Sequence, residues 1–167
     1  MISIVIPTYN HCEDLLKPCL ESIRQYTDMD QVEILVVANG CTDNTREYVQ
    51  SLGAPFKLLW YDASLGFTKA TNEGLRKSQG DYVVILNNDT VLLEQKHNAW
   101  LDMLQKPFLD SSDVGLTGIL ELPCQYVKEK FFVFFCVMIS QEVLASVGYL
   151  DEVFSPGSGE DTDLCLR

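Results

Sequence analysis

Short apolar runs bounded by polar and turn residues recur along the first half of the chain. A continuous apolar run of this length is typical of a strand buried on both faces. The pattern predicts strands at Ser3–Pro7, Glu33–Ala38, Phe56–Tyr61 and Asp81–Leu86.

Between these runs lie segments with the 3.6-residue periodicity of amphipathic helices. The first follows Asn10, which together with Glu13 resembles a capping box, and Pro18 within it predicts a kink or a late start. Its apolar residues share one face: Leu15, Leu16, Cys19, Leu20 and Ile23. Further helices are predicted from Thr42-Asp43 to Gly53, over Thr68–Ser78 with Gly80 closing it, and over Gln95–Gln105 before Pro107.

The second half is less regular. Val114–Leu120 and Phe131–Ile139 are predicted strands, and Gln141–Val147 is a predicted short helix. A loop rich in Gly, Ser and Pro, from Ser155 to Gly159, leads into Glu160–Arg167, which has the pattern of the first turns of a helix. Because the chain stops inside this predicted helix, we expect it to be a piece of a longer protein.

Alternation of strands and helices at this spacing predicts right-handed crossovers and a mostly parallel sheet with helices on both faces. The length of 167 residues fits a single domain. Ligands of such sheets bind at the carboxyl ends of the strands. Polar residues follow all the early predicted strands there: Thr8-Tyr9-Asn10, Asn39-Gly40-Cys41-Thr42-Asp43, Asp62 with Ser64, and Asn87-Asn88-Asp89-Thr90. We therefore expect a binding site at this edge.

The formal net charge of −12 narrows the classes of ligand. It disfavours nucleic acid and suits a protein that recruits a divalent cation to hold an anionic ligand. The six cysteines have no CxxC spacing, so we expect reduced, mostly buried thiols in a cytosolic protein. The longest apolar run, Phe131–Ile139, is shorter than the ~20 residues that span a bilayer, so no transmembrane segment is expected.

Two common phosphate-binding motifs are absent from the sequence. No GxGxxG follows a predicted strand, which argues against a dinucleotide fold, and no GxxxxGK[ST] occurs, which excludes a P-loop protein.

Five segments, PTYN, VVANGCTDNT, SLGFTKATNEG, LNNDT and GSGEDTDLCLR, occur in this order over almost the whole chain. Together they resemble the family 2 glycosyltransferases with the GT-A fold. The resemblance implies inverting transfer of a sugar from a UDP-, dTDP- or GDP-linked donor to a hydroxyl of a glycan or lipid-linked acceptor. It also implies Mg²⁺ or Mn²⁺ as cofactor, a nucleotide-binding half over residues 1–90, and an incomplete acceptor-side half over 91–167.

The resemblance makes Asp89 the metal ligand. Asp89 matches the last position of the family's DxD-type motif, here Asn87-Asn88-Asp89, and hard divalent cations prefer oxygen ligands. Asn87 departs from the commoner aspartate, so we expect one protein carboxylate on the metal, with water and phosphate oxygens completing the shell. The alternative is that Asn87 and Asn88 are turn residues and Asp89 caps the next segment.

The resemblance also implies nucleotide contacts in the early loops. Thr8 and Tyr9 match the base-contacting loop, and Asn39 matches a position, often acidic, that accepts from the uracil N3–H. Ala38, where the family often has Asp, is a departure. The full predicted nucleotide-binding set is Pro7, Thr8, Tyr9, Asn10, Asn39, Gly66, Phe67, Asn72, Asn87 and Asn88. Asp43 is expected to cap the second helix or to bond within its own loop.

An inverting transfer needs a general base opposite the leaving group. The family takes it from an acidic pair, here Glu160-Asp161. We expect Asp161 to be the base, with Glu160 as the fallback, in contact with the acceptor. The alternative is that Asp161 is only a first-turn helix residue favoured by the helix dipole. The late metal-binding histidine and the QxxRW segment found in parts of the family are absent.

Other functions stay open at this point. The chain is expected to act in polysaccharide or glycan biosynthesis, in the cytoplasm at the inner face of a membrane. The alternatives are a non-catalytic module that binds nucleotide sugar or scaffolds a larger enzyme, and a sugar-phosphate nucleotidyltransferase. The last needs a Gly-rich basic loop after the first strand, which Pro7–His11 does not provide. The aromatic run Phe131–Phe135 fits a homodimer contact or core packing equally well.

Overall fold

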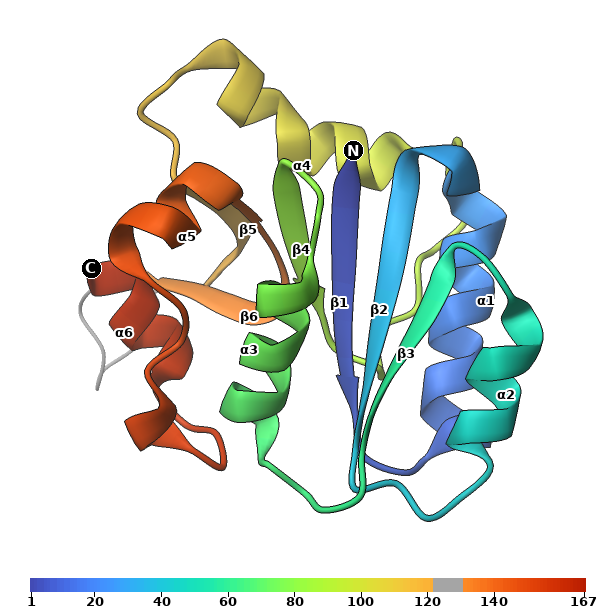
Figure 1. The fold of residues 1–167 in the computed structure, drawn as a ribbon. Coiled ribbons are helices and arrows are strands. Elements are labelled where there is room, and N and C mark those ends of the chain that lie inside the picture. Colours follow the sequence, from blue (N-terminus) through green and yellow to red (C-terminus); the bar gives the residue numbers. More distant parts are fainter. Residues whose placement is uncertain (122–130) are drawn as a thin grey trace.

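A computed structural model describes residues 1–121 and 131–167, and within these residues six strands form one sheet in the order β3-β2-β1-β4-β6-β5 (Figure 1). The strands are β1 (Ile2–Thr8), β2 (Val32–Asn39), β3 (Phe56–Tyr61), β4 (Tyr82–Leu86), β5 (Leu116–Glu121) and β6 (Phe131–Ser140). Strands β1 to β4 are parallel, whereas β6 pairs antiparallel with both β4 and β5. The predicted mostly parallel sheet is confirmed, and the antiparallel pairings belong to the second half.

Helices cover both faces of the sheet, as predicted (Figure 1). They are α1 (Lys17–Tyr26), α2 (Thr45–Leu52), α3 (Phe67–Lys77), α4 (Ala99–Asp110), α5 (Gln141–Val147) and α6 (Glu160–Leu166). Three single turns add to them: π-helical Cys12–Leu16 and the 3₁₀ segments Met29–Gln31 and Glu152–Phe154. Helices α1, α2 and α4 pack on one face, and α3, α5 and α6 pack on the other.

The double-sided packing explains the apolar run of the central strand β1. Ile4 and Ile6 belong to the core beneath α1, whereas Val5 belongs to the core beneath α3, and none of the three is exposed. A strand buried on both faces has no solvent side, so its sequence lacks apolar–polar alternation.

The structure corrects the capping box predicted for the first helix and both ends of the helix predicted over Gln95–Gln105, which spans Ala99–Asp110. The first α-helix has the late start that Pro18 predicted, but the capping box is wrong, because Asn10 Oδ1 accepts from the Thr42 backbone N–H at 2.7 Å. Asn10 and His11 have φ of 55° and 59°, and this left-handed turn precedes the helix. Helix α4 continues through Pro107, where a stop was expected. Proline has no N–H to donate to Met103 O, but Leu104 and Phe108 beside it pack against the core and keep the helix in place.

No helix among the described residues is both long enough and apolar enough to cross a membrane. The five cysteines in the described ranges have free thiols, and Cys12, Cys19 and Cys41 are buried. Burial raises the pKa of Cys19 to about 12. Cys124 lies outside the described residues.

Glu33 is a buried carboxylate at the amino-terminal end of the sheet, opposite the predicted site, and its side chain is 4% exposed. It accepts hydrogen bonds from Ser3 Oγ, from the Gln79 backbone N–H and from Lys57 Nζ at 2.6 Å. Burial alone would raise the pKa of Glu33, but these hydrogen bonds outweigh it and lower the pKa below its ordinary value. Glu33 thereby joins β1, β2, β3 and the turn that follows α3.

Replacing Glu33 with glutamine is expected to lower the free energy of unfolding by about 1–3 kcal/mol, because a buried set of donors loses its ionised acceptor. The stabilising contribution of Glu33 is fully present above the ordinary pKa of a free glutamate. It is lost as the pH falls through the lowered folded-state pKa. Denaturant unfolding of both proteins from pH 7 down to pH 3 should show the difference between them shrinking with acidification. A difference that stays constant would contradict this role.

Candidate functional site

The loops that follow β1, β2, β3 and β4 meet at one edge of the sheet, at the bottom of Figure 1. Hydrogen bonds tie them together in pairs. Asn88 Nδ2 donates to Thr8 Oγ1 at 2.8 Å, which joins the β4 and β1 loops. The Leu65 backbone N–H donates to Asn39 Oδ1, which joins the loop after β3 to the end of β2. The convergence expected from sequence is present.

The end of β1 and the loop that follows it combine buried residues with one exposed ring. Pro7 and Thr8 are buried, whereas Tyr9 is 56% exposed, so its ring is open to solvent. Asp43 fixes this loop, since its Oδ2 accepts from the Cys12 backbone N–H at 2.9 Å and its Oδ1 accepts from Thr45 at the start of α2. Burial alone would raise the pKa of the Asp43 carboxyl, but these hydrogen bonds outweigh the effect of burial. The pKa of Asp43 is therefore lower than its ordinary value. Asp43 therefore bonds across the loops and also accepts from Thr45, the first residue of α2, although the N-cap position is Asn44.

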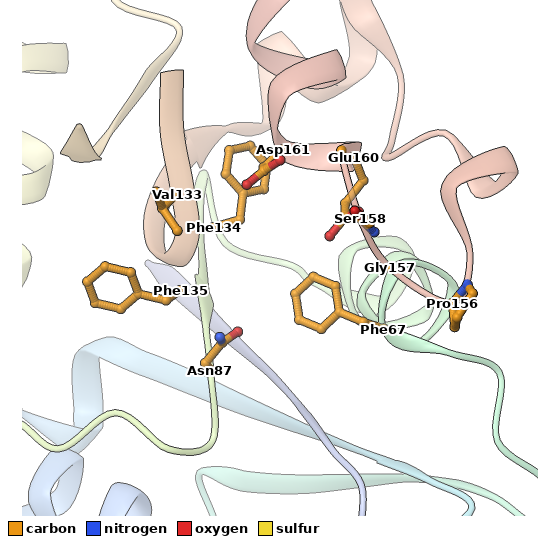
Figure 2. Close-up of a pocket in the computed structure, with 11 residues that line it drawn as sticks. Phe67, Asn87, Val133, Phe134, Phe135, Pro156, Gly157, Ser158, Glu160 and Asp161 are labelled. Atoms are coloured by element: carbon orange, nitrogen blue, oxygen red, sulfur yellow. The ribbon is translucent and has the colours of Figure 1, made fainter. Parts of the chain in front are cut away.

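A cleft of about 520 Å³ lies at the same edge, between β4, β6, α3 and α6 (Figure 2). Its walls are Phe67, Asn87, Val133, Phe134, Phe135 and residues 156–161. Of the predicted site residues it brings together Phe67, Asn87, Glu160 and Asp161. The other predicted residues lie outside its lining: Pro7, Thr8, Tyr9, Asn10, Asn39, Gly66, Asn72, Asn88 and Asp89.

The two carboxylates of the cleft differ in their surroundings. Glu160 is 8% exposed, and its Oε2 accepts from the Ser158 backbone N–H at 2.6 Å, so it holds the glycine-rich turn before α6. Asp161 is partly exposed, and the hydrogen bonds found for it within the described residues, from Thr162, use only Oδ1. Asp161 lines the cleft, and its Oδ2 has no hydrogen-bond partner within the described residues.

The residues after β4 offer oxygen atoms for a cation. Among the described residues, Asn87 Oδ1 is one of few buried side-chain oxygens without a hydrogen-bond partner. Asp89, two residues on, is exposed. No cluster of three or more His, Cys, Asp or Glu side chains occurs in the described part of the chain. This donor set fits a hard cation that takes one protein carboxylate and obtains its other oxygens from ligand and water.

The start of α3 and the loop before α6 are in direct contact. Gly66 has φ of 81°, and a Cβ at this position would lie 2.6 Å from Pro156 Cα. The Phe67 backbone N–H donates to Pro156 O, and Ser155 Oγ donates to Leu65 O at 3.1 Å. Gly66 is thus required both for its backbone conformation and for the approach of the other loop.

Replacing Gly66 with alanine is expected to destabilise the fold by about 1–3 kcal/mol from backbone strain alone, and further through the clash with Pro156. Gly53→Ala is the matched control, because Gly53 has φ of 66° and a Cβ added to it would have no atom within 4 Å. Denaturant unfolding of both variants isolates the clash. Equal losses of stability would show that the loops separate freely.

Asn72 lies apart from the cleft. It is fully buried in α3 and bonds with the backbone of Leu150 and with Glu152 Oε1. This connection joins residues 78 positions apart, so no local pattern could have revealed it. Val133, Phe134 and Phe135 were also missed as cleft residues, because an aromatic run in a strand has the same pattern whether it fills a core or lines a cleft.

The sequence profile of "Glycosyl transferase family 2" matches residues 3–120. Among curated proteins, the chain is 30% identical over 105 residues to the glycosyltransferase AglE of Haloferax volcanii, covering 60% of this chain and 33% of that protein. It is 32% identical over 124 residues to an uncharacterized glycosyltransferase of Rickettsia conorii, covering 73% of this chain and 20% of that protein. The matched segments thus cover about a third or less of the length of these relatives.

Two solved structures have a similar fold. S. aureus TarS 1-349 in complex with UDP gives a TM-score of 0.74 at 19% identity, covering 99% of this chain and 54% of that one. The mannosyltransferase PcManGT of Pyrobaculum calidifontis, in complex with GDP-Man and Mn²⁺, gives a TM-score of 0.74 at 22% identity. The match covers 96% of this chain and 49% of that one. At these identities the similarity establishes the GT-A fold.

Proposed function

The chain belongs to glycosyl transferase family 2, and on that premise we propose that it transfers a sugar, with inversion, from a nucleotide-diphosphate sugar to an acceptor hydroxyl. The observation that carries the proposal is the cleft at the carboxyl edge of the sheet, whose lining includes Asn87, Glu160 and Asp161 (Figure 2). Residues 1–90 would hold the donor, and residues 91–167 would form the acceptor side.

In this proposal the donor nucleotide lies along the converged loops. The exposed ring of Tyr9 is free to stack on a base, and the loop from Gly66 to Phe67 leads toward the cleft. Asn39 Oδ1 already accepts from Leu65 N–H, so any contact with the base would use its remaining lone pair. The neighbours' ligands, UDP in TarS and GDP-Man in PcManGT, support the choice of a nucleotide sugar.

Asp89, with the unpartnered Asn87 Oδ1 two residues before it in the sequence, would hold Mg²⁺ or Mn²⁺. When bound, the cation would neutralise negative charge on the leaving diphosphate. The Mn²⁺ in PcManGT supports this choice of cofactor.

Asp161 would act as the general base. Its free Oδ2 takes the proton of the acceptor hydroxyl while the hydroxyl oxygen forms a bond to the anomeric carbon. The bond from that carbon to the diphosphate oxygen breaks on the opposite face, which inverts the anomeric centre. Glu160, whose Oε2 accepts from Ser158 N–H, would keep the turn before α6, and with it Asp161, in place. General-base catalysis of this kind contributes about 10²–10⁴-fold to the rate.

Calorimetric titration with UDP, dTDP and GDP, each with and without Mn²⁺, tests the proposal. Binding of one nucleotide that depends on Mn²⁺ is the expected result. Absence of binding to all three would contradict the proposal and leave a scaffold. The acceptor, the role in polysaccharide assembly, the cytoplasmic location and the homodimer stay predictions.

A further inference from the structure

We propose that Asn72 is a positioning residue that fixes, against the start of α3, the loop leading into Glu160 and Asp161, the first residues of α6. The role in sugar transfer rests on the proposed function, whereas the fixing of the loop can be tested without it. Asn72 would then set the distance between the donor side of the cleft, at Phe67, and its carboxylates.

The buried side chain of Asn72 forms hydrogen bonds that join α3 to the loop at Leu150 and Glu152. Its side chain is fully buried, its Nδ2 donates to Leu150 O at 2.9 Å, and its Oδ1 accepts from Leu150 N–H at 3.0 Å. Nδ2 also donates to Glu152 Oε1 at 3.1 Å. Both amide hydrogens and the carbonyl oxygen are thus engaged by the chain itself, which leaves no N–H of Asn72 for a nucleotide.

Further hydrogen bonds join the same loop to α3 and to Leu65 before it, closer to the cleft. Arg76 Nη2, one turn after Asn72, donates to the same Glu152 Oε1 at 2.9 Å. Ser155 Oγ then donates to Leu65 O, and Phe67 N–H donates to Pro156 O. The loop therefore follows α3 from its middle to its first residue before it turns into α6.

Because Asn72 is buried, its hydrogen bonds are expected to contribute more to holding the loop than the exposed Arg76–Glu152 pair. Arg76 and Glu152 are 41% and 39% exposed, and ion pairs at such exposure contribute little. The Asn72 bonds are shielded from water, and loss of one partner there leaves Leu150 polar groups unsatisfied. The loop also packs closely against the start of α3, where a Cβ on Gly157 would lie 3.2 Å from Phe67 Cβ.

Asn72→Asp is the informative change, because it keeps the shape and the acceptor for Leu150 N–H. It replaces both donors with a carboxylate oxygen facing Leu150 O and Glu152. Amide hydrogen exchange at Phe67, Ser155 and Ser158 is expected to accelerate about tenfold or more, while exchange in β1 stays unchanged. Glu152→Ala buries no new charge and should loosen the same amides to a smaller degree. Glu152→Gln combined with Asn72→Asp should restore part of the protection.

The matched control is Thr27→Val, which removes another buried side-chain hydrogen bond, from Trp100 Nε1 at 2.9 Å, far from this loop. Thr27→Val should lower the unfolding temperature without selectively accelerating amide hydrogen exchange at Ser155 and Ser158. Unchanged exchange of these amides in both Asn72→Asp and Glu152→Ala would overturn the proposal. Acceleration spread evenly over β1 and the loop in Glu152→Ala would also overturn it.

Kinetics separate positioning from nucleotide contact. With the preferred nucleotide and Mn²⁺, the Kd of Asn72→Asp should stay within about threefold of the unchanged chain, whereas turnover should fall about tenfold or more. A Kd that rises as much as turnover falls would make Asn72 a nucleotide ligand and overturn the positioning role. If the unchanged chain binds none of the three nucleotides, the proposed function fails, and hydrogen exchange alone decides whether Asn72 fixes the loop.

Discussion

Replacement of Asp161 by asparagine is expected to reduce the turnover of sugar transfer by about 10²–10⁴-fold, the contribution of a positioned general base. The amide keeps the shape and the acceptor for Thr162 but cannot take the proton of the acceptor hydroxyl at Oδ2. Nucleotide binding with Mn²⁺ should change little, because the cleft carboxylate faces the acceptor side. The measurement is turnover beside calorimetric Kd for the same preparations.

Asp163→Asn is the matched control for this change. Asp163 lies two residues further along α6, outside the cleft lining, and pairs with Arg167 at 2.9 Å. Asp163→Asn removes the same charge as Asp161→Asn, but at a position outside the cleft. The turnover of this variant should therefore remain within about twofold of that of the unchanged chain. If Asp161→Asn kept half of the original turnover, Asp161 would not be the base and Glu160 would be the next candidate.

Replacement of Asp89 by alanine is expected to abolish the Mn²⁺-dependent part of nucleotide binding. Removal of a residue that only supports a metal ligand lowers metal affinity by about 10–100-fold. Removal of the ligand itself should lower the Mn²⁺-dependent affinity by at least as much. The donor set after β4 includes only this carboxylate and the unpartnered Asn87 Oδ1, and the amide oxygen carries no net charge. Calorimetry with and without Mn²⁺ should therefore give nearly equal Kd values for the variant.

Glu94→Ala controls for the change in net charge, because Glu94 is exposed and lies five residues from Asp89 in the sequence. Its Mn²⁺ dependence should match that of the unchanged chain. A normal Mn²⁺ effect in Asp89→Ala would place the cation elsewhere and leave Asp89 as a turn residue.

The sequence alone was sufficient for most of the fold. The runs around Ile4, Ile34 and Val84 have no polar alternation, because strands at the centre of the sheet are buried on both faces. The helix predicted over Gln141–Val147 is confirmed to the residue, since Ser140 caps its start and Gly148 follows its end. Local rules failed at Pro107, because Leu104 and Phe108 on either side of it pack against the core and hold the helix despite the proline.

For the site, the sequence determined which residues follow the strand ends, and the parallel order of the sheet was enough to predict that these loops converge. Only the tertiary structure decided which of them share a cleft. Asn87 directly follows β4 and Asp161 lies in α6, and they line one cavity because the antiparallel β6 places the later segments beside β4. The bonds between Asn72 and Leu150 were decided by the same long-range packing. Periodicity and turn chemistry act over a few residues, whereas these contacts depend on how distant segments pack across the sheet.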